Sequence, residues 1–552
     1  MINNFDENVV FGLDFEDLKN RFWKKYIIGS DTIYFRGYVY SHTIEKIIEI
    51  IKSLDKESIE YFVNSLDGNF VLIVLKNEFS FIAVDKIRSI PIFFAKIGNK
   101  FYVDCNPKEI VNKNNFNKSV IDSSILEISM SGYTVGNKTV YRYLHSLKAG
   151  EFVVFDNSSY KYIQYYKYFG NIEYKHYDDY IEELSIVTLS IFRKLLNDIG
   201  DRQIIIPLSA GNDSRLIASV LKHLGAKNVK CYSYGSIGNF EASVAEIVAN
   251  KLGYEWVFIP LTHKSERRYY NSEEYKEYLK FSETYCSVPY IQGLSTIKYL
   301  ENINFINEDA IFINGSTGDF ISGNHISTLM KKNTTNTTRE ERKENILNNL
   351  INKHFSLWGH LKTNKNIALV KKSLWSEITA ACKNLDSKDR DHLFYEYSEL
   401  VDRQSSYVIS GQRTYEFYNY EWRLPLWDEE YLYFWQKIPS EFKVNQKLYV
   451  DMLKKKNFGN VWSEDIPVNK KTITPKWIIP ARFLFKIPFA LFGVRGKKIW
   501  RELEVSLFYY WMDVSHMVDE INYFSMIKSI FKKPRNHVSW KAKDYLKNLM
   551  QR

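Results

Sequence analysis

The stretch Gln203-Ile-Ile-Ile-Pro-Leu-Ser-Ala-Gly-Asn-Asp-Ser-Arg215 decides the fold of this 552-residue chain. Residues 203–208 are a short apolar run, which is typical of a strand buried on both faces. A glycine-containing turn follows this run. The chain then alternates between helices over 215–224 and 241–252 and strands over 229–234 and 256–259. Because parallel strands need crossover helices, this order predicts a parallel sheet.

The turn after the first strand carries residues suited to phosphate binding. Ser209, Ala210 and Gly211 are small enough for the backbone to approach a ligand closely. The helix N-terminus beyond them offers unpaired N–H groups and a partial positive charge. The Ser214 hydroxyl adds a donor, whereas the Asp213 carboxylate would repel phosphate unless a cation lay between them. Mg²⁺ would supply that cation, so the turn favours magnesium pyrophosphate over a bare anion.

The same residues also fit a plain strand-to-helix turn in which Asn212 or Asp213 caps the helix. They do not form a Walker loop, which needs Gly-Lys-Ser/Thr after four intervening residues, nor a dinucleotide-binding Gly-x-Gly-x-x-Gly. Spacing alone leaves the phosphate loop and the plain turn open.

The region before this strand is expected to be mainly β. Strands are predicted over 32–40, 70–75, 79–85 and 101–104, with one helix over 42–53 and a later strand over 310–314. Short strands at close spacing indicate an antiparallel layered domain. The expected fold class is therefore α/β in three parts: an α+β layered domain over 1–165, a parallel-sheet domain over 175–470 that becomes helical, and a basic, aromatic helical extension over 471–552.

The composition indicates which cellular compartment and which classes of binding partner to expect. The formal net charge is +10, which suits anionic partners, but no RNP-type, zinc-finger or helix-turn-helix pattern appears, so no nucleic-acid partner is expected. The four cysteines have no metal-ligand spacing and suit a reducing compartment. The start of the chain does not have the pattern of a signal peptide, and no apolar run is long enough to span a bilayer. A cytoplasmic location is expected.

Three further segments follow the loop in order: Asn314-Gly-Ser-Thr-Gly-Asp-Phe-Ile-Ser-Gly323, Tyr420-Glu-Trp-Arg-Leu-Pro-Leu-Trp-Asp428 and Asn445-Gln-Lys-Leu-Tyr449. The loop is similar to the Ser-Gly-Gly-x-Asp-Ser loop of ATP-dependent adenylating enzymes, with Ala210 and Asn212 as mild departures. Together the four segments resemble the asparagine synthetase family, in which they are the pyrophosphatase loop, Gly-Glu-Gly-x-Asp-Glu, Glu-x-Arg-x-Pro-Phe-x-Asp and the segment of the catalytic lysine. Four ordered motifs are more specific than one.

The resemblance implies an ATP-pyrophosphatase site with ATP and Mg²⁺ as cofactors. The residues implied to bind ATP are Leu208, Ser209, Ala210, Gly211, Asp213, Ser214, Ser233, Tyr234 and Gly315. Asp213 and Asp319 would hold Mg²⁺ between them, and Lys447 would neutralise charge on the α-phosphate and on a later tetrahedral intermediate. Taken singly, Asp319 also suits a turn beside Gly318, and Lys447 suits a solvated surface.

The N-terminal domain departs from that family in its nucleophile. Its segments Phe35–Tyr38, Leu66–Phe70, Val84–Phe93 and Leu147–Gly150 resemble the family's glutaminase half. That half uses a cysteine exposed by removal of Met1, whereas Ile occupies position 2 here and the first cysteine is Cys105. Cys105 lies at a strand end with no amino-terminal base, so we interpret residues 1–165 as a degenerate class II amidotransferase domain.

The second departure concerns the base. Ser316 and Phe320 stand where the family motif has its two glutamates, and serine cannot act as a comparable base. Either Glu416 or Glu421 replaces it, or the nucleophile arrives as a free amine. β-Lactam synthetases and lasso-peptide cyclases show similar drift within this family, and they keep adenylation while changing substrates.

The implied reaction has two steps. A carboxylate attacks the α-phosphorus of ATP to give an acyl-adenylate and pyrophosphate, and ammonia or an amine, supplied for instance by a separate protein, then displaces AMP. The tail resembles that of asparagine-synthetase-like proteins that accompany bacterial surface-polysaccharide genes, which implies amidation of a uronic acid carboxylate on a sugar nucleotide or lipid-linked glycan. Asparagine formation from aspartate with ammonia, and an inactive scaffold that retains the fold, are the alternatives.

The segment 476–500 has a distinctive composition. It is rich in Trp, Phe and aliphatic residues, contains six basic residues and has no acidic residue. This composition suits a peripheral contact with the inner face of a membrane. The alternative is a tail that packs on the ligase domain, because two prolines would interrupt a long amphipathic helix.

Overall fold

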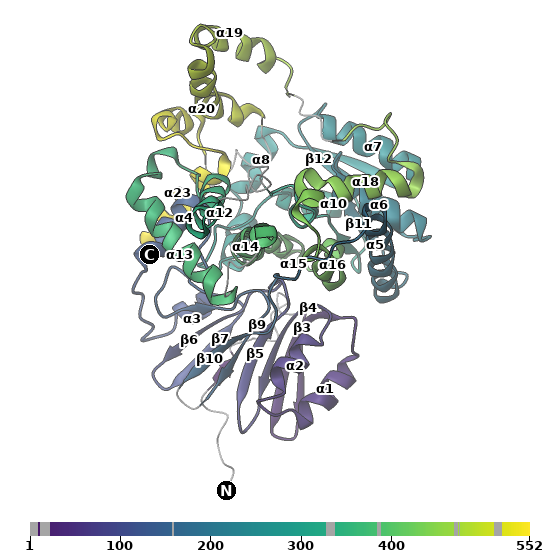
Figure 1. Ribbon diagram of the computed structural model, residues 1–552, viewed down its shortest axis with the longest axis vertical. Helices are drawn as coiled ribbons and strands as arrows, with labels where there is room; N and C mark the ends of the chain where they lie inside the picture. The colour runs from purple at the N-terminus through teal and green to yellow at the C-terminus, as the bar shows by residue number, and fades with distance from the viewer. Residues whose placement is uncertain are drawn as a thin grey trace.

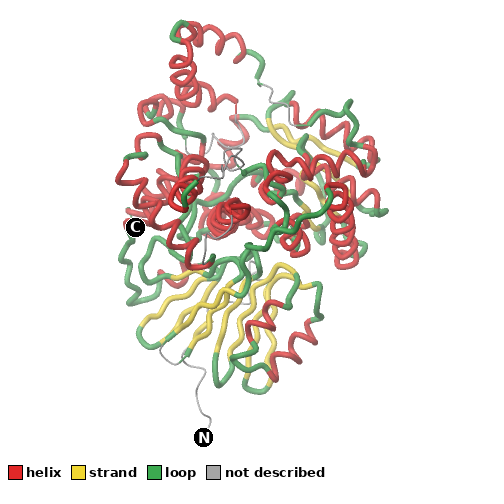
Figure 2. Tube along the Cα trace, viewed as in Figure 1, coloured by secondary structure: helices red, strands yellow, loops and turns green. Residues whose placement is uncertain are grey.

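The computed structural model describes residues 9–11, 22–156, 159–326, 337–382, 388–468, 473, 475–512 and 521–551. The expectation about Ile2 therefore lies outside the described residues. Figure 1 shows a β-rich N-terminal part at the bottom, a larger part above it, and a pair of helices that projects at the top. Figure 2 shows the same division by secondary structure.

Two sheets build the N-terminal part. The larger sheet is antiparallel and has the strand order β10-β9-β5-β4-β3-β2. Its strands are β2 (Trp23–Ile28), β3 (Asp31–Val39), β4 (Gly68–Leu75), β5 (Ser80–Val84), β9 (Glu151–Phe155) and β10 (Tyr160–Gln164). The smaller sheet has the order β1-β7-β6-β8, with β1 (Val9–Phe11), β6 (Phe93–Ile97), β7 (Lys100–Asp104) and β8 (His145–Ser146).

These sheets lie between helices in a layered arrangement. The helices α1 (Ile44–Ser53) and α2 (Ile59–Asn64) cover the outer face of the larger sheet. The inner faces of the two sheets share one core, in which the Phe94 and Phe155 rings are 5.2 Å apart. The other face of the smaller sheet packs on α3 (Pro107–Val111), α4 (Asp122–Ser131) and α23 (His537–Met550), so the C-terminal helix returns to the N-terminal part. The expected α+β layered domain is confirmed.

The second part is built on a parallel sheet of order β13-β12-β11-β14-β15. Its strands are β11 (Ile204–Pro207), β12 (Val229–Gly235), β13 (Glu255–Pro260), β14 (Ile311–Ile313) and β15 (Glu421–Arg423). The chain moves outward in one direction from β11 to β13 and then returns to the other side of β11 at β14. This reversal is a topological switch point, and open parallel sheets bind ligands beyond the carboxyl ends of the strands at such points.

Helices surround this sheet and fill the rest of the chain. Those around the sheet are α5 (Tyr177–Ile199), α6 (Asn212–His223), α7 (Phe240–Leu252), α8 (His263–Tyr270), α9 (Glu273–Phe281), α10 (Leu294–Asn302) and α11 (Gly318–Ile321). The later ones are α12 (Arg339–Lys353), α13 (Asn364–Ala381), α14 (Asp391–Ser398), α15 (Arg413–Phe417), α16 (Glu429–Trp435), α17 (Ser440–Lys443), α18 (Lys447–Lys456), α19 (Ile478–Ala490), α20 (Gly493–Met512) and α22 (Tyr523–Lys528). A π-helix spans Glu399–Val408 between α14 and α15. The expected α/β class is confirmed.

A fully buried arginine fixes the start of α6. The Arg215 guanidinium donates hydrogen bonds to the carbonyl oxygens of Ala210, Val461, Ile466 and Pro467, at 2.7 to 3.3 Å. A buried cation is tolerated only where its donors are matched. Arg215 thereby ties the turn after β11 to the segment after α18.

We expect Arg215→Met to lower the free energy of unfolding by roughly 3 kcal/mol, because the buried carbonyl oxygens of Ala210, Val461 and Ile466 lose their donor. Urea unfolding followed by circular dichroism measures this change. Arg193→Met, at an exposed position of α5, is the control and should leave stability within about 0.5 kcal/mol. Equal effects of the two changes would contradict the assigned role.

Candidate functional site

The loops after β11 and β14 meet at the switch point. Helix α6 begins at Asn212, three residues before the predicted start, with Gly211 as its N-cap. Inside the first loop the Ser209 N–H donates to the Ser214 Oγ at 3.0 Å, and the two hydroxyls are 3.1 Å apart. The Gly211 N–H donates to the Ser209 Oγ at 3.2 Å. Ser209, Gly211 and Ser214 therefore share one compact turn at the head of a helix.

The Asp213 carboxylate joins three elements at this point. Its Oδ2 accepts the backbone N–H of Asp319, on α11, at 2.9 Å. Its Oδ1 accepts the hydroxyl of Tyr449, on α18, at 3.1 Å. Burial and the nearby charge of Asp319 raise the Asp213 pKa to about 8. The first turn of α6, the loop after β14 and α18 are thus held to one another through a single side chain.

Two glycines allow this close approach. A Cβ added at Gly315 would lie 2.8 Å from the Asp213 Cβ, and one at Gly318 would lie 2.7 Å from the Asp213 Cγ. Real side chains do not reach such distances, so each position requires glycine as long as Asp213 keeps its place. Gly315 was expected in the site, and the structure places it against Asp213.

Three of the residues expected to bind ATP lie at the ends of β11 and of the neighbouring strand β12. Leu208 is buried after β11, and its carbonyl oxygen accepts the Ser233 hydroxyl at 2.7 Å. The Trp256 indole N–H donates to the same Ser233 oxygen at 3.0 Å, which fixes this strand end. Tyr234 is half-buried, and its hydroxyl would lie 3.3 Å from a Cβ at Gly293. Leu208, Ser233 and Tyr234 therefore share the carboxyl edge of the sheet with the loop.

A chain of charged groups extends behind Asp319. The His325 Nε2 is 3.2 Å from the Asp319 Oδ2, and its Nδ1 is 2.5 Å from the Glu399 Oε1. The other Glu399 oxygen is 2.9 Å from the His354 Nε2. Burial opposes a charge on His325, yet the two carboxylates raise its pKa to about 9, whereas burial lowers the His354 pKa to about 4. A cationic His325 therefore lies between Asp319 and Glu399.

Lys447 begins α18, two residues before Tyr449, and its side chain is exposed. Its ammonium lies over the Tyr177 ring, 4.6 Å from the ring centroid, and 5.6 Å from the centroid of Phe442. The lysine thus rests on aromatic rings, on the helix whose Tyr449 contacts Asp213.

The two glutamates considered as bases lie elsewhere. Glu416 forms buried ion pairs with Arg36, from the N-terminal part, and with Arg413, both at 2.6 Å. Glu421 is the first residue of β15 and pairs with Arg202 at 2.9 Å, just before β11 begins. It therefore lies at the amino edge of the sheet, opposite the loops. The structure brings neither glutamate to Asp213 and Asp319.

Cys105 lies beside the Arg36 guanidinium, with 3.9 Å between Nη1 and Sγ. Burial raises the pKa of its thiol to about 11, which leaves almost no thiolate near neutral pH. The environment is that of a structural cysteine.

The two departures from the Gly-Glu-Gly-x-Asp-Glu pattern have different structural settings. Phe320 is completely buried and stacks on Trp427, with ring centroids 5.7 Å apart, so it is a core residue. Ser316 is half-buried, and its backbone N–H donates to the Asn314 Oδ1 at 3.0 Å. Neither provides a carboxylate to the site.

The sequence did not predict several residues that lie at this site. His325, Glu399 and His354 come from three separate segments, and no local pattern connects them. Tyr449 lay within a quoted segment, Asn445–Tyr449, but only the fold brings its hydroxyl to Asp213.

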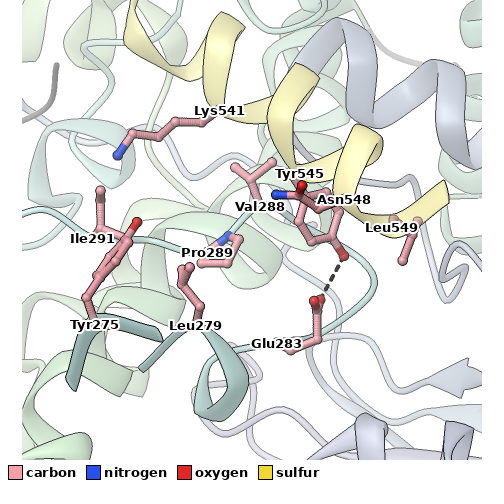
Figure 3. A pocket seen from close by; sticks show the side chains of 10 residues that line it. All are labelled: Tyr275, Leu279, Glu283, Val288, Pro289, Ile291, Lys541, Tyr545, Asn548 and Leu549. Atoms are coloured by element: carbon pink, nitrogen blue, oxygen red, sulfur yellow. Dashed lines mark hydrogen bonds between the residues drawn. The ribbon is translucent and has the colours of Figure 1, made fainter. Parts of the chain in front are cut away.

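A separate cavity lies away from these loops, between α9, the segment after it and α23 (Figure 3). It is lined by Tyr275, Leu279, Glu283, Val288, Pro289, Ile291, Lys541, Tyr545, Asn548 and Leu549. The Tyr545 hydroxyl donates to the Glu283 Oε1 at 2.7 Å. None of the residues expected in the site lines it.

Comparison with known proteins relates the N-terminal part to a known domain family. Residues 45–167 match the model of the glutamine amidotransferase domain family. The chain therefore contains an amidotransferase-type domain. No curated protein matches the chain.

Two solved structures show a distant likeness to the chain. Glutamine phosphoribosylpyrophosphate amidotransferase from B. subtilis, complexed with ADP and GMP, is 11% identical, with a TM-score of 0.20, over 62% of this chain and 74% of that one. A structure described as the allosteric regulatory enzyme of purine biosynthesis is 9% identical, with a TM-score of 0.17, over 54% of this chain and 58% of that one.

The carboxylates of Asp213 and Asp319 can be compared with the ligands that Mg²⁺ prefers. Among the described residues, no group of three or more His, Cys, Asp or Glu converges as a metal-binding cluster. Asp213 and Asp319 are carboxylates at the starts of α6 and α11. Mg²⁺ commonly takes one or two carboxylates and completes its shell with phosphate oxygens and water. The residues present fit Mg²⁺ that arrives with a nucleotide.

We expect Glu416→Ala to lower the free energy of unfolding by about 3–5 kcal/mol, because it leaves Arg36 and Arg413 buried without their carboxylate. Glu255→Ala is the control: its side chain is 59% exposed in its pair with Lys230, so the change should cost about 1 kcal/mol or less. Urea unfolding measures both. A catalytic base at Glu416 would instead give a stable, inactive protein, which would contradict the structural assignment.

Proposed function

We propose that this protein is an ATP-dependent, AMP-forming ligase of the asparagine synthetase type, which adenylates a carboxylate and transfers ammonia or an amine to it. The observation that supports this most directly is the position of Asp213. Its carboxylate lies at the head of a helix, at the switch point of a parallel sheet, and bonds to the backbone of Asp319. A carboxylate in a phosphate-sized turn suits a nucleotide that brings a divalent cation.

The residues around Asp213 would bind different parts of ATP. The Ser209 and Ser214 hydroxyls and the free N–H groups at the head of α6 would donate to the pyrophosphate oxygens. Leu208, Ala210, Ser233 and Tyr234 would line the nucleoside. When bound, Mg²⁺ would offset the charge of the phosphates. Asp213 and Asp319 would hold it.

Lys447 would act on the α-phosphate. Its ammonium rests on the Tyr177 ring, and an exposed lysine on an aromatic face can reorient toward an anion at modest cost. Positive charge placed where negative charge develops stabilises both the adenylation transition state and the later tetrahedral intermediate. The other contribution of the site is positioning, because holding two reactants together removes much of the entropic barrier.

The nitrogen would come from outside the chain. Glu416 and Glu421 are committed to arginines, and Ser316 offers no carboxylate, so the described site suits a nucleophile that arrives as free ammonia or amine. The half-buried Cys105 thiol, with its raised pKa, does not suit attack on glutamine. We therefore propose that the amidotransferase-type domain is structural and that a separate protein supplies the nitrogen.

The carboxylate that we propose is a uronic acid of a sugar nucleotide or glycan used for surface-polysaccharide biosynthesis. Aspartate is the alternative acceptor, and the same assay distinguishes them.

We expect carboxylate-dependent exchange of pyrophosphate into ATP, tested with a nucleoside-diphosphate uronic acid and with aspartate. Asp213→Asn should reduce this exchange by on the order of 10²–10³-fold, because the variant loses the charge that holds the cation. Asp201→Asn, at an exposed position before β11, is the control and should retain exchange.

Exchange with aspartate alone would contradict the uronic acid acceptor while keeping the ligase. Absence of both exchange and ATP binding would support the inactive scaffold. Full activity of Asp213→Asn would remove the role given to that carboxylate.

A further inference from the structure

Two helices near the C-terminus form a hairpin that projects from the body of the protein. We call residues 475–512 the hairpin: α19 runs from Ile478 to Ala490, Leu491 and Phe492 make the turn, and α20 runs from Gly493 to Met512. Figure 1 shows it at the top, at the opposite end from the N-terminal sheets. Pro480 and Pro488 both lie within α19, and this 13-residue helix ends two residues after Pro488, as expected of prolines that interrupt a long helix.

The hairpin is packed within itself. Ile478, Trp500 and Phe508 are buried in a small core between the two helices. Gly496 lets the helices meet closely, because a Cβ there would overlap the Phe489 carbonyl oxygen. Near the base, Arg482 forms an ion pair with Glu504 across the two helices. The apolar side chains that remain exposed are therefore not needed to pack the two helices together.

Those outer side chains gather at the turn. Leu491 is 85% exposed, Phe492 68% and Val494 85%. Along α19, Phe483, Leu484, Phe485 and Ile487 are also exposed, from 47% to 68%. Monomeric soluble proteins rarely leave a contiguous apolar surface of this kind uncovered.

The charged residues around the turn are all basic. The basic residues of the segment are Lys476, Arg482, Lys486, Arg495, Lys497, Lys498 and Arg501, and no acidic residue lies between Lys476 and Arg501. The acidic residues of α20 are Glu502 and Glu504, which pair with Lys533 and Arg482. Apolar residues at the turn with cations beside them match the boundary between acyl chains and acidic headgroups.

The base of the hairpin is fixed to the sheet domain. The Tyr510 carbonyl oxygen is 2.8 Å from the His263 Nε2, and the Tyr510 hydroxyl accepts a hydrogen bond from Arg267 at 2.7 Å. His263 begins α8, three residues after β13 ends, at the carboxyl edge of the parallel sheet. The hairpin is thus rooted at the edge that carries the Asp213 site.

We propose that the hairpin is a membrane-docking element that inserts Leu491, Phe492 and Val494 into the surface of an anionic lipid bilayer. None of the described helices is long and apolar enough to cross a bilayer, so the contact is peripheral. The basic residues draw the hairpin to acidic headgroups, and the apolar turn anchors it. One consequence rests on the proposed function: docking here would hold the carboxyl edge of the sheet toward an acceptor carried on a lipid.

The test is flotation of the full chain with vesicles of phosphatidylcholine alone or with added phosphatidylglycerol. We expect binding to the acidic vesicles, at least ~10-fold weaker binding to the neutral ones, and weakening with added salt. A variant carrying Leu491→Asp, Phe492→Asp and Val494→Asp should lose ~10-fold or more of the binding. These side chains are exposed, so the variant should keep the wild-type circular dichroism spectrum and unfolding midpoint.

Tyr61→Asp is the matched control, because this ring is 83% exposed on α2, in the N-terminal part. It should float like the wild type. Failure of the wild type to bind acidic vesicles, or equal binding by the turn variant, would overturn the proposal. So would concentration-dependent dimers, without lipid, that the turn variant abolishes, since the surface would then bind a second copy. None of these outcomes depends on ligase activity.

Discussion

The packing around the candidate site depends on one carboxylate, that of Asp213. It lies at the point where the strand order of the parallel sheet reverses. It connects the first turn of α6, the backbone of Asp319 and the hydroxyl of Tyr449. Two glycines are required beside it because no Cβ fits. A buried carboxylate next to a second one is costly without a cation, which the raised Asp213 pKa reflects. His325 offsets the charge of Asp319 from one side. Under the proposed function, a divalent cation would offset the charge of Asp213.

The two halves of the chain are tied together through charges that take no part in this site. The amidotransferase-type domain reaches the sheet domain through Arg36 and Glu416, a pair whose side chains are almost fully buried. Cys105, beside that pair, has a thiol with a raised pKa. Because these groups satisfy one another, the interface suits a structural role of the N-terminal domain. Nitrogen delivery by another protein is consistent with that arrangement.

The sequence predicted what is local. Apolar runs and turns located β3, β4, β5 and β7 of the N-terminal sheets and β11 to β14 of the parallel sheet. They did not indicate the other N-terminal strands or β15. The glutamates were harder to place, because Glu416 and Glu421 lie within six residues of each other yet face an interface and the opposite sheet edge. The link from His325 to Glu399 spans 74 residues and enters a π-helix, so no periodic pattern could indicate it.

The most direct test of the Asp213 account is calorimetric titration of ATP into the full-length protein with and without Mg²⁺. The paired carboxylates should repel the bare nucleotide, so we expect ATP to bind at least ~10-fold more tightly when Mg²⁺ is present. Equal affinity for ATP in the presence of Mg²⁺ and of a chelator would contradict the claim that Asp213 and Asp319 hold a cation beside the phosphates.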